Sequence, residues 1–127
     1  LRPVELENGD LWTALERRAA RFGARLRLPV PRPELSSATE LAAYRTVGEA
    51  LANAGRHAPD APMTVTVAVV EGLLRIEIRN DLPAAASRRA AGIGIDSMRA
   101  RAEELGGHAE AGPHGNEWRV AVTLPLG

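Results

Sequence analysis

The chain has 127 residues, a length that fits one domain with a buried core. Its sixteen basic and sixteen acidic residues balance, and its two Trp, one Tyr and one Phe offer few stacking surfaces, so the composition disfavours nucleic-acid binding. Cysteine is absent and the three histidines lie far apart, which excludes disulfides, thiol nucleophiles and the usual zinc sites.

The first predicted elements are a helix followed by a strand. Asp10 has the side chain of an N-cap, and apolar residues recur at helical spacing over 11–22 until Gly23 supplies a C-cap. Leucines alternate with arginines over 24–30, which predicts a strand. Three prolines between positions 29 and 33 predict an extended connection after it.

A long helix is predicted next. Ser37, with Glu40 three residues later, forms a capping box at its start. The helical pattern continues to about His57 or Ala58, because Pro59 cannot continue it. One side of this helix is apolar and is expected to pack on a sheet. That side contains Leu41, Tyr44, Val47 and Leu51.

A hairpin is predicted in the middle of the chain. β-Branched residues alternate with other side chains over 63–70 and 73–79, and Glu71-Gly72 between these runs is a turn sequence. Residues 80–91 have neither a helical nor a strand period, so we expect them to form a mobile loop with the character of a lid.

The last third predicts a helix and a second strand pair. The helix covers 94–105 and ends at Gly106-Gly107. Strands over 108–111 and 118–124 flank a turn at 113–116. This order of elements predicts an α+β fold, a two-layer sandwich in which helices cover one face of a mixed, mostly antiparallel sheet.

Four polar side chains fall close together near the end of the long helix. Glu49, Asn53 and His57 are four residues apart and project as one stripe, with Arg56 beside it. A row of solvated polar groups is the simpler interpretation. However, asparagine is a poor helix former, so its place inside a helix indicates a functional reason. The stripe therefore predicts a ligand site.

A glycine-rich segment precedes the last predicted helix. Gly92-Ile-Gly94 is a weak signal alone, but glycines let a backbone approach phosphates, and a helix N-terminus attracts anions. Ser97 stands where a full Gly-x-Gly-x-x-Gly has its third glycine, and no lysine follows, so P-loop and dinucleotide sites are disfavoured. Together with the stripe, the segment predicts a different kind of nucleotide site.

In order and spacing, these segments resemble the ATP-binding catalytic domain of two-component sensor histidine kinases, in the GHKL (Bergerat-fold) superfamily, and most closely its nitrate-sensor-like branch. The resemblance extends over essentially the whole chain. It implies one catalytic domain at 1–127, a C-terminal fragment of a longer protein. The matching segments are Leu1-Arg-Pro3, the N-box-like 49–58, a strand ending at Asn80, the run 92–107 and Leu124-Pro125.

The resemblance assigns the stripe to catalysis and Mg-ATP binding. Asn53 would ligate Mg²⁺ through its amide oxygen, a ligand type that this cation accepts. Glu49 would orient or polarise groups near the γ-phosphate. Arg56 would contact the phosphates, with His57 beside it.

The resemblance also implies roles for the segment before the last helix. Gly92 and Gly94 would form the hinge of a lid that closes over the nucleotide and offers backbone N–H groups to phosphate oxygens. Ile95 and Met98 would help to form the wall of the purine pocket.

The adenine end departs from the family pattern. The family has Asp-x-Gly-x-Gly, whose aspartate accepts the adenine amino hydrogen, where this chain has Asn80-Asp81-Leu82-Pro83-Ala84. Strand parity predicts that Asn80, rather than Asp81, faces inward. Its neutral oxygen would accept from adenine at a cost of ~1 to 2 kcal/mol in affinity relative to a carboxylate. Trp118 stands where the family often has threonine.

Three functions remain open. The first is a histidine kinase module that binds ATP and Mg²⁺ and donates the γ-phosphate to a histidine on a separate dimerisation domain of the same protein, for relay to a response regulator. The second is a degenerate interaction domain with weak or no ATP binding, favoured by the altered adenine motif. The third is an anti-sigma-factor-type serine kinase of the same superfamily. For the histidine kinase module, the resemblance implies a domain in the cytoplasm. It also implies a full-length protein that is a homodimer, with a membrane anchor as one option.

Overall fold

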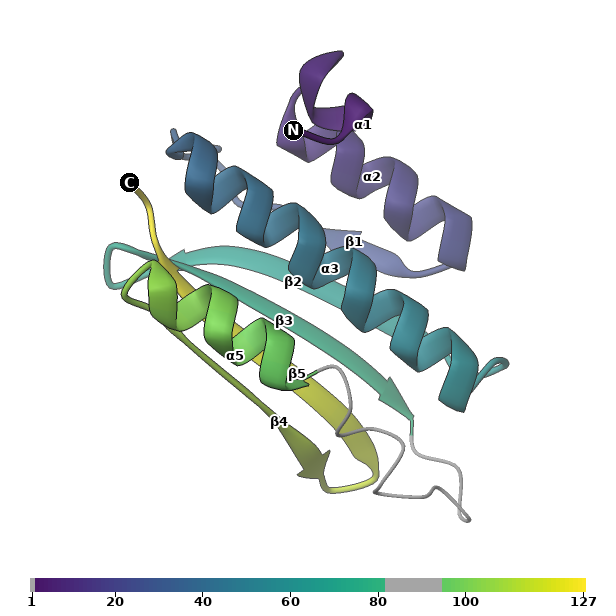
Figure 1. Ribbon diagram of the computed structural model, residues 1–127. Coiled ribbons are helices and arrows are strands. Elements are labelled where there is room, and N and C mark those ends of the chain that lie inside the picture. Colours follow the sequence, from purple (N-terminus) through teal and green to yellow (C-terminus); the bar gives the residue numbers. More distant parts are fainter. Residues whose placement is uncertain (1, 82–94) are drawn as a thin grey trace.

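The computed structural model describes residues 2–81 and 95–127, with all their side chains except that of His57. These residues form one sheet with helices on one of its faces (Figure 1). In chain order the elements are α1 (Val4–Glu7), α2 (Leu11–Phe22), β1 (Arg25–Arg27), α3 (Ser37–His57), β2 (Met63–Val70), β3 (Leu73–Asp81), α5 (Ile95–Glu104), β4 (His108–His114) and β5 (Glu117–Pro125).

The sheet is mixed and mostly antiparallel. Its strand order is β1-β2-β3-β5-β4, in which β1 runs parallel to β2 and every other neighbouring pair is antiparallel. The parallel pair follows from the connection through α3, whereas the two hairpins make antiparallel pairs. This architecture confirms the predicted α+β two-layer sandwich. In the described part of the chain, no helix combines the length and apolar character that a membrane crossing requires.

The core lies between the helices and the inner face of the sheet. On β3, Leu74, Ile76 and Ile78 are at most 1% exposed, and they point toward the helices. The residues between them are polar and lie on the open face, so the strand alternates as its sequence predicts. The same parity places Asn80 on the inner face at 5% exposure and Asp81 outside, as predicted.

Helix α2 has the predicted ends. The Asp10 side chain accepts a hydrogen bond from the Thr13 backbone N–H at 2.7 Å, and Gly23 closes the helix in the left-handed region with φ 67°.

The start of α3 differs by one residue from the prediction. The N-cap is Ser36, not Ser37, and its hydroxyl accepts a hydrogen bond from the Thr39 N–H at 3.2 Å. Because two serines stand side by side, sequence spacing alone selects the wrong one. Glu40, the expected partner in a capping box, forms an ion pair with Arg2 at 3.2 Å instead. The predicted end of the helix, at His57 or Ala58, is confirmed.

Two strand predictions need correction. The strand expected over 24–30 is only Arg25–Arg27, because it pairs with just three residues of β2 and prolines follow, which supply no backbone donor. The strand expected to end at Ala111 continues to His114, so the turn is only Gly115-Asn116. Since β4 is at the sheet edge, Pro113 is tolerated within it.

The first two residues of the loop expected over 80–91 belong to a strand instead. Asn80 and Asp81 still pair with β5 and belong to β3. The remaining part of that prediction, and the start of the helix at Gly94, fall outside the described residues. Within them, α5 begins at Ile95 and ends one residue before the predicted Leu105.

The two glycines after α5 have different reasons to be glycine. Gly106 has φ 84°, a backbone conformation that side chains disfavour. Gly107 passes so close to β5 that a Cβ atom would lie 2.0 Å from the Thr123 carbonyl oxygen. The pair thus ends the helix and packs the chain directly against the sheet before β4 begins.

Candidate functional site

The candidate site is at one end of the molecule. Figure 1 shows that the C-terminal ends of α3 and β3 and the N-terminal end of α5 lie on the same side, and α3 contacts both β3 and α5. These three ends carry Asn53, Asn80 and Ile95 respectively. Segments that are far apart in the sequence therefore bring the predicted residues to one end of the fold.

Glu49 lies two turns before the end of α3 and is held by α5. Both terminal nitrogens of Arg101 donate to its carboxylate, Nη2 to Oε1 at 2.7 Å and Nη1 to Oε2 at 3.3 Å. This is a bidentate ion pair, the arrangement that best matches the two planar groups. The Glu49 side chain is 39% exposed and that of Arg101 only 18%. Glu49 is thus half-buried, fixed in direction and compensated in charge.

Asn53 is one turn closer to the end of α3. Its amide oxygen accepts a hydrogen bond from a terminal nitrogen of Arg56, which is exposed. Asn53 itself is half-buried. The contact confirms that the two side chains are neighbours, as their spacing predicts, and an incoming ligand reaches both from solvent.

The donor set determines which kind of metal complex fits. The described residues contain no group of three His, Asp or Glu that could hold a metal ion alone. The amide oxygen of Asn53 is a suitable ligand for Mg²⁺, but one ligand leaves most of the coordination shell to other oxygens. The residues therefore fit a cation that arrives with phosphate groups rather than a resident metal.

Asn80 occupies the predicted adenine end. It is buried at the end of β3, directly opposite Trp118 on β5 and Met63 on β2. Its amide nitrogen donates to the Asp81 carbonyl at 3.2 Å, and its amide oxygen is the acceptor that the side chain can offer a ligand. Trp118 is half-buried and packs against the core. A large ring therefore lies beside the residue expected to accept from adenine.

The remaining predicted residues are divided by burial. Ile95 is half-buried at the first position of α5, whereas Met98 is only 2% exposed and belongs to the core. Gly92, Gly94 and the side chain of His57 fall outside the described parts of the structure.

Sequence reasoning did not find Arg101. It lies on α5, 52 residues from Glu49, and no local spacing joins them. The available signal was indirect: a half-buried carboxylate on a helix that packs against another helix requires a cationic partner. Arginine is the residue that can match both carboxylate oxygens.

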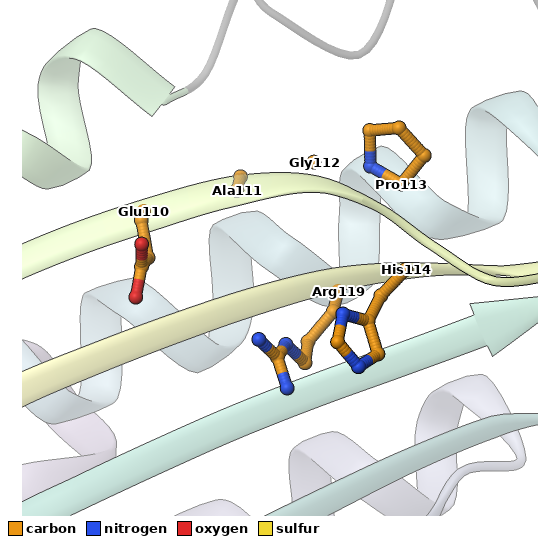
Figure 2. A pocket seen from close by; sticks show the side chains of 6 residues that line it. All are labelled: Glu110, Ala111, Gly112, Pro113, His114 and Arg119. Atoms are coloured by element: carbon orange, nitrogen blue, oxygen red, sulfur yellow. The ribbon is translucent and has the colours of Figure 1, made fainter.

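A hollow lies on the face of the sheet that points away from the helices, near the β4–β5 turn. Figure 2 shows Glu110, His114 and Arg119 on one side of β4 and β5, with Ala111 and Pro113 on the other. The hollow has a volume of about 150 Å³ and opens over Gly112, where no side chain fills the space. It faces away from the helices and is separate from the candidate site.

Comparison with known proteins identifies the class of fold. No family model matches the chain. It is 28% identical over 133 aligned residues to the sensor histidine kinase LiaS of Bacillus subtilis (strain 168), an alignment that covers 99% of this chain and 37% of LiaS. The chain thus spans little more than a third of that curated relative.

Two solved structures extend the comparison. A blue-light activated histidine kinase, EL346 of Erythrobacter litoralis, superposes with a TM-score of 0.66 at 16% identity, over 91% of this chain and 40% of that one. The catalytic domain of the histidine kinase ThkA superposes with a TM-score of 0.63 at 13% identity, over 92% and 89%. The chain therefore has the GHKL (Bergerat) fold of histidine kinase ATP-binding catalytic domains, which confirms the resemblance at the level of the fold. The nitrate-sensor-like branch stays a prediction.

Proposed function

We propose that this chain is the ATP-binding catalytic module of a two-component sensor histidine kinase. It binds Mg-ATP where α3 and β3 end and α5 begins, and it presents the γ-phosphate to a histidine on a separate dimerisation domain. The bond from the γ-phosphorus to the bridging oxygen breaks, a bond to the imidazole nitrogen forms, ADP leaves and the imidazole proton is released. A response regulator then receives the phosphoryl group.

One observation carries the proposal. Asn53 and Arg56 are in contact on the solvent side of α3, with Glu49 fixed one turn earlier, in a fold shared with histidine kinase catalytic domains. An amide oxygen, a guanidinium and an oriented carboxylate together suit a cation-bound phosphate chain. The half-buried ion pair to α5 fixes the carboxylate in one orientation, whereas a side chain on a merely solvated helix face stays mobile.

The proposed roles follow from these positions. Asn53 offers its amide oxygen to the Mg²⁺ that comes with the nucleotide, and Glu49 orients groups near the γ-phosphate. Arg56 exchanges its bond to Asn53 for a phosphate oxygen, which is a stronger acceptor because it is charged. His57 stands next to Arg56 in sequence, and the family resemblance implies a place for it beside the same phosphates.

The purine would lie toward β3. Asn80 accepts from adenine through its amide oxygen, and Ile95 and Met98 form part of the pocket wall. For Gly92 and Gly94, which fall outside the described residues, the family resemblance implies the role of a hinge. These roles rest on the family pattern and on the placement of Asn80, Ile95 and Met98 at one end of the fold.

A second function has specific support at the adenine end. Asn80 has no charge to offer adenine, and its cross-strand neighbour is Trp118 rather than a small residue. If that ring occupies the purine space, the chain keeps the fold but acts only as a docking domain on a kinase partner. Nucleotide binding decides between the two functions.

The deciding experiment is isothermal titration of the chain with ATP, with and without Mg²⁺. We expect saturable, Mg²⁺-dependent binding that weakens by at least about tenfold in Asn53→Ala, since a direct cation ligand is lost. Arg45→Ala is the matched control, because Arg45 is exposed on the same helix and takes no part in the site. Absence of binding at millimolar ATP would reject the kinase module and support the docking domain.

A further inference from the structure

The bidentate pair between Glu49 and Arg101 is the least explained contact at the site. It joins the helix that carries Asn53 to the helix that follows residues 82–94. The Arg101 side chain is 18% exposed, so its charge is partly withdrawn from water and depends on Glu49 for compensation. Its bidentate geometry holds both partners in one orientation, which a single contact between exposed side chains does not.

The neighbouring cation on α5 behaves differently. Arg99 is 46% exposed, and it reaches Asp96 at 3.8 Å on its own helix and the Ala109 carbonyl at 3.4 Å. Its contacts therefore lie within α5 and between α5 and β4. Of these two arginines, only Arg101 reaches α3, so the sequence Arg99-Ala-Arg101 combines a packing residue with one that faces the candidate site.

Charge explains what Arg101 does there. A triphosphate is strongly anionic, and an uncompensated carboxylate one helical turn from Asn53 would repel it. With Arg101 bonded to both oxygens, Glu49 presents a neutral pair with a fixed orientation. The carboxylate can then stand beside the γ-phosphate at little electrostatic cost.

We infer that Arg101 is a positioning residue for nucleotide binding, which acts by orienting Glu49 and compensating its charge. The inference rests on the proposed function, because it assumes that the triphosphate lies beside Glu49. This role differs from a purely structural one in one respect. The loss of nucleotide affinity on removing Arg101 depends on the γ-phosphate of the nucleotide and on the charge of Glu49.

The test is a set of variants of this chain titrated with Mg-ATP and Mg-ADP. We expect Arg101→Ala to weaken Mg-ATP binding by about tenfold, or ~1.4 kcal/mol, and Mg-ADP binding by clearly less. Glu49→Gln should restore the affinity for Mg-ATP in the Arg101→Ala background, because it removes the exposed charge. Arg101→Lys keeps the charge but cannot bind both carboxylate oxygens in one plane, so its affinity for Mg-ATP should fall between those of Arg101→Ala and the parent chain.

Arg99→Ala is the matched control, since it removes a neighbouring cation that does not contact Glu49. Unfolding of each variant in urea separates lost affinity from lost stability. The charge-swapped Glu49→Arg, Arg101→Glu variant should regain stability relative to Arg101→Ala, because the reversed pair restores the contact between α3 and α5.

The outcomes distinguish the two proposals. If the parent chain binds no nucleotide, the proposed function fails and this role fails with it. If the parent chain binds Mg-ATP but Arg101→Ala weakens ATP and ADP equally, or if Glu49→Gln gives no rescue, the role of Arg101 alone is wrong and the ion pair is only structural.

Discussion

The two halves of α3 use polar side chains for different purposes. In the N-terminal half, Thr39 and Tyr44 are 2% and 6% exposed, and each is bonded to another part of the chain. The Thr39 hydroxyl donates to the Pro125 carbonyl at 2.9 Å. The Tyr44 hydroxyl donates to Glu5 and accepts from Arg18, both at 2.8 Å. These groups are consumed by the fold.

In the C-terminal half, Glu49 is bonded to Arg101 of α5, whereas Asn53 and Arg56 lie toward the solvent edge. Asn53 is half-buried and Arg56 is exposed, and among the described side chains each hydrogen-bonds only to the other. A ligand can replace that contact without opening the core. The comparison teaches that a polar residue on a helix indicates a site when its bonds can be exchanged, whereas a buried and fully bonded one indicates architecture.

The largest expected effect tests whether the C-terminal half of α3 also contributes to the stability of the fold. Leu51 lies between Glu49 and Asn53 but is fully buried on the opposite face of α3. Leu51→Ala should lower the free energy of unfolding by roughly 2–5 kcal/mol, because it leaves a cavity in the core. Urea denaturation measures this loss. Leu51→Met, which nearly conserves volume, should cost less than about 1.5 kcal/mol, and equal losses in both variants would contradict the cavity argument.

Thr39→Val should have the next largest effect on stability, because it removes a buried hydrogen bond of the N-terminal half of α3. Valine has nearly the same shape but leaves the Pro125 carbonyl without its donor and removes the partner of the Ser36 hydroxyl. We expect a loss of about 1–3 kcal/mol in unfolding free energy, with the affinity for Mg-ATP unchanged. Thr39→Ser keeps the hydroxyl and serves as the control. A marked loss of nucleotide affinity in folded Thr39→Val would erase the distinction between the halves.

Tyr44→Phe makes a smaller change in the same half. It removes one hydroxyl that links Glu5 of α1 to Arg18 of α2, while the aromatic ring stays under the Arg18 guanidinium at 5.0 Å. The expected loss is about 1 kcal/mol, because Glu5 and Arg18 keep a direct though longer contact of 3.8 Å. Thermal unfolding should detect it. Tyr44→Phe in a Glu5→Gln background should cost less than in the parent chain, because the two residues share one network.

Much of the fold could be predicted because its elements are specified locally. The alternation of β2 and β3, the caps of α2 and the left-handed Gly106 after α5 each act within a few residues. The short helix α1 was missed because four residues give no measurable period, and its position depends on Leu6 packing into the core and on Glu5 reaching Tyr44. Such contacts span 39 residues and leave no local pattern.

The candidate site was predictable only in part, for the same reason. The neighbourhood of Asn53 and Arg56 follows from helical spacing, and the inward position of Asn80 follows from strand parity. The partner of Glu49 does not follow from either, since Arg101 comes from another helix. Sequence periodicity predicts which side chains share a face, and only the packing of α5 on α3 determines what they meet.

The smallest expected effect concerns the N-terminal caps of α2 and α3, whose contributions to the free energy of unfolding should differ in their dependence on pH. Hydrogen bonds from Thr13, with a lesser attraction to Arg32, hold the pKa of Asp10 below its ordinary value of 3.8. A lowered pKa stabilises the fold above the unfolded-state pKa, and the contribution is lost as pH falls through the folded-state pKa. Asp10→Ala should therefore cost up to about 1 kcal/mol at pH 7 and progressively less below pH 4, as urea denaturation at each pH would show.

Ser36→Ala provides the contrast, because the serine hydroxyl that caps α3 does not titrate in this range. Its loss should lower the free energy of unfolding by about the same amount at pH 7 and below pH 4. Asp10→Asn retains a capping oxygen without the charge, so its difference from Asp10→Ala should also be independent of pH. An Asp10→Ala penalty that stays constant down to pH 3 would mean that the charge adds nothing to the cap. The N-terminal caps of α2 and α3 would then respond to pH in the same way, since neither would depend on an ionised group.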